Sequence, residues 1–349
     1  MNTRVSKRYA QTLFSAFALS VLSITASTQE GHAQDKLYVL SSIKPVHSLV
    51  AMVTGDLANS EIIVKGAASP HTYALAPAQA RDIQRADAIF WVGEDLEAFL
   101  EKPLATIGAR ATLIELMETP GLQKMKFREG GAFEKHDDHD EDDHDDDHDD
   151  DHGHDDDHDK HDDHDEDHDD DHGNHDDHDG FDPHIWLSPD NAKRILAYIA
   201  SALSDLDPDN KAAYIANATA AMQDIDQLTD AITDNLSPIK NGGFLLFHDS
   251  FQYFEHAFGL AASGAISIHP EVAPGARRIA EIRRLLRKRN VRCVFTEPQF
   301  DAKMVDVILQ GTGKRAVEID PLGAALPQGD TLYFELMQAM STSFRKCLG

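Results

Sequence analysis

The chain of 349 residues contains only two cysteines and, beyond its N-terminal region, no run of about 18 uninterrupted apolar residues. The second absence excludes a membrane-spanning helix from most of the chain, because such a helix needs about 20 apolar residues. An HExxH sequence and a recognisable nucleophile motif are also missing, which argues against a zinc hydrolase. Because no CxxC pair is present, the cysteines do not indicate a zinc site of their own.

Negative charge is what the sequence has in excess, and one segment carries most of it. Residues 136–179 contain 25 Asp, two Glu and one Lys, a net charge of −26 out of −29 for the whole chain. The same segment holds 13 of the 20 histidines. Aspartate alternating with imidazole, a ligand that divalent transition metals favour, indicates metal binding, with a merely solvated acidic tract as the alternative.

This segment is the centre of a predicted insert, which we place at residues 120–182. Between 136 and 179 it has no apolar residue to bury, so nothing offsets the entropy of ordering it. We therefore expect the insert to be disordered without metal. Its many interchangeable histidines predict several weak metal sites and do not define one tight site.

The N-terminal residues have the pattern of a secretory signal peptide. A basic start precedes the apolar stretch 12–27, which is too short to be a stable membrane anchor. The small residues Gly31 and Ala33 predict cleavage after Ala33, so that residues 1–33 are removed. We expect an exported, soluble protein in the periplasm, without a lipid anchor because no cysteine lies near the cleavage point.

The two cysteines, Cys293 and Cys347, are expected to form a disulfide, because an even pair in an exported protein favours one. On the loop-entropy model such a bond would stabilise the fold by about 4 kcal/mol. Two buried free thiols are the alternative.

Strand-like and helix-like segments alternate on both sides of the insert. The expected strands are 36–42, 61–65, 88–92, 111–116, 243–247, 260–268, 291–296 and 315–320, and helices are expected between them. Residues 207–236 differ, since the helix-forming sequence 208–235, opened by Asp207 and Pro208, predicts one helix roughly 40 Å long. This pattern predicts an α/β fold of two similar parallel-sheet βα domains, 34–206 and 237–349, joined by one long linking helix.

Three histidines outside the insert stand in positions typical of a site. His71 comes just after a strand, His248 ends a strand, and His184 follows the insert, while Asp320 ends a later strand. The carboxyl ends of parallel strands line the crevice between two such domains, so we expect these four side chains to converge. Three neutral imidazoles with one carboxylate or water make a tetrahedral zinc site.

Other histidines and the basic helix receive ordinary roles. His47 and His256 are expected to be packed or surface residues on helices, and His269 to lie in a loop that could border the cleft. The basic segment 277–289 could suggest nucleic acid. In an exported acidic protein, a solvated face or a contact with an acidic partner surface is the better interpretation.

Motifs in both halves resemble, in order, those of the periplasmic zinc-binding ZnuA family, within the metal-specific class of ABC-transporter solute-binding proteins. The similarity covers nearly all of residues 36–349, and the acidic segment stands directly before the Asp-Pro-His motif, where this family carries one. The matching segments are 42–45 (SIKP), 66–73 (GAASPHTY), 92–99 (VGEDLEAF), 182–189 (DPHIWLSP), 247–249 (FHD), 269–276 (HPEVAPGA), 296–300 (TEPQF) and 320–323 (DPLG).

The resemblance implies a zinc site in the interdomain cleft, with His71, His184 and His248 as ligands and Asp320 as a fourth ligand or near neighbour. Some zinc members carry Glu immediately before the first histidine, where this chain has Pro70. The fourth position therefore stays open between Asp320 and water. Manganese relatives carry Glu at the position of His248, and a third imidazole moves the preference toward zinc, because harder oxygen ligands suit manganese.

The resemblance further implies a carrier without enzymatic activity. It would be a solute-binding protein that binds Zn²⁺ with high affinity and delivers it to an inner-membrane ABC permease. We expect a monomer with no nucleic-acid partner. A periplasmic metal buffer or chaperone and an adhesin-like metal-binding protein are the alternatives. A buffer would need only the insert, and an adhesin would need an anchor that the sequence does not show.

Overall fold

The computed structural model describes residues 36–128, 180–239, 242–267, 274–288, 291–301 and 303–349. The predicted signal peptide, the acidic segment 136–179 and His269 lie outside the described residues. None of the described helices is long and apolar enough to cross a membrane.

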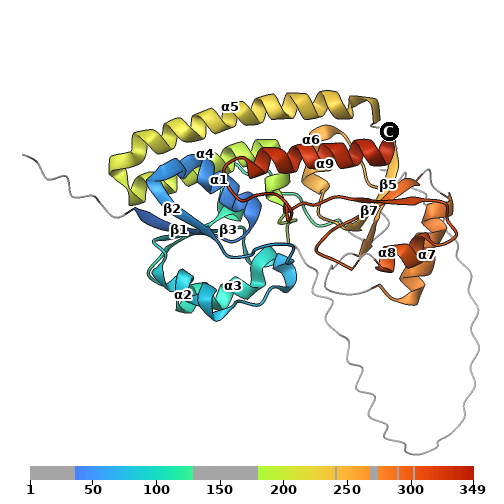
Figure 1. Ribbon diagram of the computed structural model, residues 1–349, viewed down its shortest axis with the longest axis horizontal. Coiled ribbons are helices and arrows are strands. Elements are labelled where there is room, and N and C mark those ends of the chain that lie inside the picture. Colours follow the sequence, from blue (N-terminus) through green and yellow to red (C-terminus); the bar gives the residue numbers. More distant parts are fainter. Residues whose placement is uncertain (1–35, 129–179, 240–241, 268–273, 289–290, 302) are drawn as a thin grey trace, which may run out of the picture. The chain divides into compact units, whose positions relative to one another are not determined.

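The first parallel sheet has four strands in the order β2-β1-β3-β4. The strands are β1 (Leu37–Ser41), β2 (Ala58–Ile62), β3 (Ala88–Trp91) and β4 (Thr112–Glu115), with helices α1 (Lys44–Thr54), α2 (Pro77–Arg85) and α3 (Glu94–Thr106) between them. Figure 1 shows α1 on one side of this sheet and α2 and α3 on the other. Strand β3 is buried at every position, as expected for a central strand with both faces covered.

The second parallel sheet repeats this arrangement, with the order β6-β5-β7-β8. It consists of β5 (Gly243–His248), β6 (Ala265–Ser267), β7 (Val291–Thr296) and β8 (Arg315–Glu318), with helices α6 (Gln252–Phe258), α7 (Ala276–Lys288) and α8 (Lys303–Leu309). In both sheets the first strand along the chain lies between the second and the third. The predicted α/β fold with two parallel sheets is therefore confirmed.

Three long helices pack beside the two sheets. They are α4 (Pro189–Leu206), α5 (Lys211–Leu236) and α9 (Leu332–Leu348). Helix α5 packs against α1, α4 and α9, and Figure 1 shows it running along both sheets, as expected for a long linking helix. It begins at Lys211, after a 3-10 turn at Pro208–Asn210, because the Asp207 carboxylate holds this turn through Asn210 and Tyr214.

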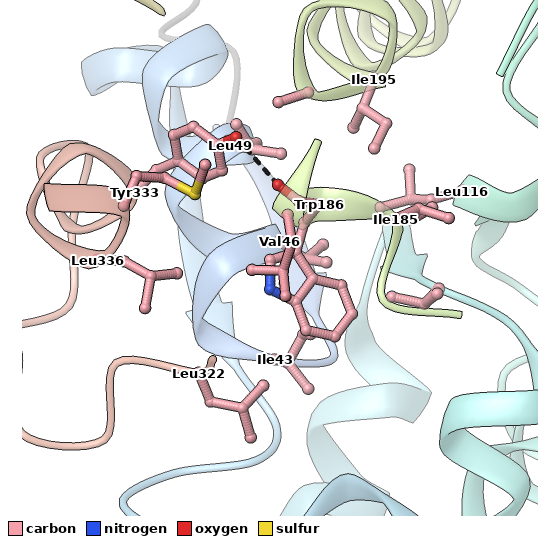
Figure 2. Packing of buried hydrophobic residues seen from close by; sticks show 14 of the residues in the cluster. Ile43, Val46, Leu49, Leu116, Ile185, Trp186, Ile195, Leu322, Tyr333 and Leu336 are labelled. Atoms are coloured by element: carbon pink, nitrogen blue, oxygen red, sulfur yellow. Dashed lines mark hydrogen bonds between the residues drawn. The ribbon is translucent and has the colours of Figure 1, made fainter. Parts of the chain in front are cut away.

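The main hydrophobic core is shared by the two halves. Trp186 lies in it with 1 % of its surface exposed, and its Nε1 donates to the Pro321 carbonyl at 2.9 Å. Tyr333, at the start of α9, donates its hydroxyl to the Trp186 carbonyl at 2.9 Å (Figure 2). Residues Lys36–Gly349 accordingly form one compact unit, and the last helix packs on the first half of the chain.

The structure adjusts two details of the prediction and confirms a third. Strand β2 is Ala58–Ile62 and not 61–65, because Leu37–Ser41 pairs with these residues; only Ile63 and Val64 continue as single hydrogen bonds. Residues 120–128 and 180–182, which we placed in the insert, make defined contacts. The predicted disulfide is confirmed, since Cys293 in β7 is bonded to Cys347 in α9 with Cα atoms 5.7 Å apart.

Candidate metal site

Three histidines that are far apart in the sequence converge on one point. The ring centroids of His71 and His184 are 5.6 Å apart, those of His71 and His248 5.8 Å, and those of His184 and His248 5.3 Å. One ring nitrogen from each lies within 4.8 Å of the others. In the part of the chain that the structure describes, no other group of three or more His, Cys, Asp or Glu side chains has this geometry.

Each histidine is positioned by a short, well-anchored backbone segment. His248 is the last residue of β5, which has β6 on one side and β7 on the other. His71 lies in the 3-10 turn Pro70–Thr72, which packs against α3. His184 immediately precedes the 3-10 turn Ile185–Leu187, whose three residues are all buried. The site therefore lies where both halves meet.

Two of the three rings are oriented by a buried carboxylate. Asp182 Oδ1 lies 2.7 Å from His184 Nδ1, and Glu297 Oε1 lies 2.8 Å from His248 Nδ1. When Nδ1 donates to a carboxylate, the lone pair of Nε2 is left for a metal. In agreement, the Nε2 atom of His248 is buried and has no hydrogen-bond partner among the described residues, and the same holds for His71.

The electrostatic surroundings differ between these rings. Burial lowers the pKa of His71 well below its ordinary value, and the neighbouring His184 and His248 lower it further. Burial also acts to lower the pKa of His248, but the nearby carboxylates, Glu297 first and then Asp249 and Asp182, together outweigh it and raise this pKa. Neutral imidazole is the metal-binding form, so His71 is ready to bind a cation without releasing a proton.

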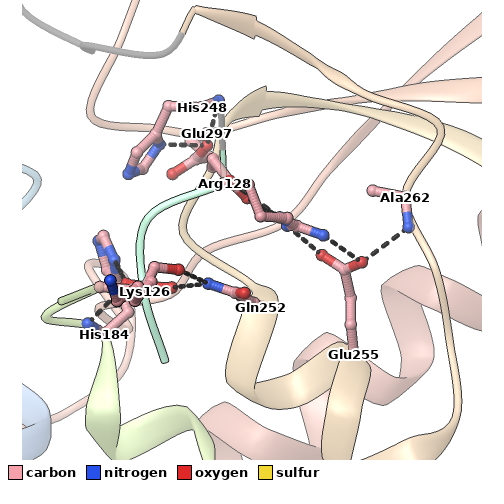
Figure 3. A network of polar contacts seen from close by, with 10 residues as sticks. Lys126, Arg128, His184, His248, Gln252, Glu255, Ala262 and Glu297 are labelled. Atoms are coloured by element: carbon pink, nitrogen blue, oxygen red, sulfur yellow. Dashed lines mark hydrogen bonds and ion pairs between the residues drawn. The ribbon is translucent and has the colours of Figure 1, made fainter. Parts of the chain in front are cut away.

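Carboxylates outnumber cationic groups next to the rings. Asp182 and Glu297 are buried against the rings of His184 and His248. Asp249, which follows His248, is nearly buried and shares the cation Arg128 with Glu255 (Figure 3). Three neutral nitrogens bring no charge to a divalent cation. The excess of nearby carboxylates stabilises that positive charge in a buried site.

The space between the rings is small. The three histidines, Glu297 and Gln299 line a cavity of about 10 Å³, together with apolar side chains such as Leu96. A volume of this size accommodates about one water-sized species. The site is therefore suited to a single ion.

Asp320 is not part of this cluster. Its Oδ1 accepts from Gln299 Nε2 at 2.8 Å and from the Leu322 amide at 3.0 Å, and its Oδ2 accepts from the Ala324 amide at 2.5 Å. These bonds hold the turn that follows β8. Gln299 connects this turn to the metal pocket, which it also lines.

Sequence reasoning missed the two carboxylates that orient the rings. Asp182 precedes His184 by two residues in the same Asp-Pro-His motif, so its proximity was readable in principle. Glu297 directly follows β7, and β7 pairs with β5, which ends at His248. Finding Glu297 required the strand order.

The two histidines and the basic helix outside the site have ordinary positions in the structure. His47 is 4 % exposed and packed on α1, and burial lowers its pKa, while His256 is exposed. Arg277 on α7 has a side chain 94 % exposed, as expected for a solvated face. The structural roles of His47 and His256 are confirmed.

The family model described as zinc-uptake complex component A, periplasmic (ZnuA), matches residues 39–347. The chain belongs to the ZnuA family. Its relative from Brucella abortus (strain 2308), described as high-affinity zinc uptake system protein ZnuA, is 43% identical over 310 residues, which cover 89% of this chain and 91% of the relative.

Solved structures show the same fold for this family member. A crystal structure of ZnuA has a TM-score of 0.69 at 24% identity and covers 90% of this chain and 100% of that one. A mutant structure of the laminin-binding adhesin Lmb from Streptococcus agalactiae has a TM-score of 0.67 at 24% identity, with coverage of 90% and 100%. At this level of identity the two structures support the architecture and do not distinguish carrier from adhesin.

Proposed function

We propose that this protein is a periplasmic solute-binding protein that binds Zn²⁺ with high affinity at His71, His184 and His248 and delivers it to an inner-membrane ABC permease. The observation that carries the proposal is the convergence of three imidazoles within 4.8 Å, two of them oriented by carboxylates. Zinc favours such nitrogen ligands in tetrahedral geometry. Membership of the ZnuA family supports the role in zinc uptake.

The fourth coordination position is filled by Asp320 or by a water molecule. Asp320 can reach the ion only by giving up some of its bonds to Gln299, Leu322 and Ala324. A water molecule needs no such rearrangement. Replacing Asp320 by Ala therefore lowers affinity modestly if water takes over.

The acidic segment 136–179 has a separate role in this proposal. Its charge of −26 attracts Zn²⁺ at long range, and its 13 histidines bind several ions weakly and exchange them rapidly. The segment collects zinc when zinc is scarce, and the three-histidine cluster carries it. The protein acts as a monomer and without turnover of a substrate.

Deletion and substitution separate the cluster from the acidic segment. We compare the full protein, a variant without residues 136–179, and the triple variant His71→Ala/His184→Ala/His248→Ala by competition with a chromophoric chelator. The deletion variant should retain one tightly bound zinc, and anomalous scattering should place this ion among the three rings. The triple variant should lose it. Loss of tight binding in the deletion variant, with retention in the triple variant, refutes the assignment.

A further inference from the structure

Residues 121–128 and 180–184, on the two sides of the acidic segment 136–179, form a two-segment stem. Lys126 and Phe181 form an antiparallel bridge, and the Asp182 amide donates to the Met125 carbonyl at 2.8 Å. The second segment continues directly into His184. The stem is thus continuous in sequence with His184, a proposed ligand.

Helix α6, which belongs to the second sheet, binds both segments of this stem. Gln252 Nε2 donates to the Lys126 carbonyl at 3.1 Å and to Asp182 Oδ2 at 3.3 Å. The Met125 amide donates to the Tyr253 hydroxyl at 3.0 Å, and this hydroxyl donates to the Asp182 carbonyl at 2.8 Å. The stem therefore crosses from the first half of the chain to the second.

Arg128 anchors the far end of the stem. Its guanidinium donates to both oxygens of Asp249, with Nε–Oδ2 at 2.9 Å, and to both oxygens of Glu255 at 2.9 and 3.0 Å (Figure 3). Glu255 Oε2 also accepts from the Ala262 amide at 2.7 Å. Paired hydrogen bonds of this kind fix position and orientation together, which a single point charge does not.

The anchor lies next to one proposed ligand, and the stem ends at another. Asp249 directly follows His248, and Asp182 in the stem is bonded to the ring of His184. The line of contacts therefore runs from His248 through Asp249 and Arg128 along the stem to His184. If one ion is bound by both His184 and His248, its coordination depends on the distance between these two rings.

We infer that Arg128 is a positioning residue for metal binding, which clamps the stem to Asp249 and Glu255 and so fixes His184 relative to His248. The inference rests on the proposed function, because it assumes that these histidines hold the ion. A plain structural ion pair would stabilise the fold and leave the geometry of the bound metal unchanged. The two possibilities differ in what happens to the metal in a protein that is still folded.

Arg128→Lys is the main test, because it keeps the positive charge and removes the fork that binds two carboxylates. In the full chain we expect zinc to dissociate faster and the affinity to fall by roughly 10- to 100-fold, the range for groups that orient metal ligands. With one equivalent of Co²⁺ as a probe, the visible ligand-field spectrum should change. Arg128→Met should have a larger effect, since it leaves two carboxylates without their cation.

Arg278→Lys is the matched control. The Arg278 side chain is 22% exposed against 20% for Arg128, it pairs with Glu281, and its Nη2 donates to the Ala265 carbonyl at 2.6 Å. Arg278→Lys should lower the melting temperature and leave the Co²⁺ spectrum and the rate of zinc dissociation unchanged. The inference is overturned if Arg128→Lys behaves in the same way. Since this substitution keeps the charge, it decides the question even if Arg128→Met does not fold.

His71→Ala in the same assays separates this inference from the proposed function. If His71→Ala retains tight zinc, the ligand assignment is wrong whatever Arg128 does. If His71→Ala loses tight zinc while Arg128→Lys keeps wild-type dissociation and spectrum, the ligands stand and only the role of Arg128 is refuted.

Discussion

His71 is held differently from the other two rings of the cluster. His184 and His248 each have a buried carboxylate on Nδ1, whereas no hydrogen bond to the His71 ring is formed within the described part of the chain. The backbone turn Pro70–Thr72 and packing alone set its place. The site therefore combines two rings that carboxylates orient with a third ring that no carboxylate orients.

Removing each ring in turn should have the largest effect and tests this difference directly. His71→Ala, His184→Ala and His248→Ala should each weaken zinc binding by orders of magnitude, because a tetrahedral site loses a protein ligand. Only His184→Ala and His248→Ala should also lower the stability of the metal-free protein, by about 1–3 kcal/mol, because each removes a ring donor from a buried carboxylate, Asp182 or Glu297. Chelator competition and thermal unfolding measure the two effects. Equal destabilisation by all three would contradict the comparison.

Replacing the carboxylates should have the next largest effect. Asp182→Asn and Glu297→Gln keep the shape of each side chain and remove its charge. We expect zinc affinity to fall roughly 10- to 100-fold in each, as for other groups that orient metal-bound histidines. Glu118→Gln, a change at an exposed acid that pairs with Lys124, is the control and should leave affinity unchanged. Wild-type affinity in Glu297→Gln would show that His248 needs no such partner.

The pH dependence of zinc binding should sharpen the comparison further. The pKa of His248 is raised, so a proton competes with zinc there as the pH falls, while the lowered pKa of His71 keeps that ring neutral. For the metal-free fold, His248 contributes stability below its unfolded pKa that is lost as pH rises through the folded pKa. His71 has the opposite sign. In Glu297→Gln the acid-side loss of affinity should move to lower pH, measured by competition titrations from about pH 5 to about pH 8. An unshifted profile would contradict this cause.

Glu97 should give the smallest effect on zinc, because its carboxylate serves the backbone. It lies in α3, against the turn that carries His71, and its Oε2 accepts from the Val92 and Gly93 amides at 2.9 and 3.0 Å. Burial raises its pKa to about 7. The resulting stability is present below the unfolded pKa and is lost as pH rises through about 7.

Glu97→Gln can keep both amide bonds through its oxygen and carries no charge. We expect unchanged zinc affinity and, at about pH 8, a gain in unfolding free energy of roughly 3 kcal/mol at most. The gain should shrink toward about pH 5. Urea unfolding at both pH values measures it, and a loss of zinc affinity would show that the buried acid on this side also serves the site.

The sequence indicated the fold and the three rings for clear reasons. Apolar runs bounded by turn residues indicated seven of eight strands nearly in place. The eighth, β2, was displaced because its middle residues Asn59–Glu61 are exposed or only partly buried and lack an apolar pattern. His248 ends an apolar run that reads as a strand, and the family motifs name all three histidines. These are local features, and local features can be read along the chain.

The side chains that the sequence did not indicate, Arg128 and Glu297, have partners that are far away along the chain. Arg128 is 121 residues from Asp249 and 127 from Glu255, and it borders a segment whose composition gave no sign of order. Glu297 is 49 residues from His248. For Asp320 the sequence indicated a role that the contacts do not show. Its place at a strand end predicts a metal ligand, but its oxygens accept the hydrogen bonds of a turn. The strand order and side-chain geometry decide such cases.

The last helix of the chain has a consequence for the order in which the molecule assembles. Tyr333 in α9 supports Trp186, which stands two residues after His184, and Cys347 near the end of α9 is bonded to Cys293. These contacts join residues up to 147 positions apart, and the entropy cost of closing such long loops slows folding. Because synthesis starts at the N-terminus, all three histidines are present in the growing chain before the α9 residues that complete these contacts. The metal site is therefore complete only once the residues of α9 are in place.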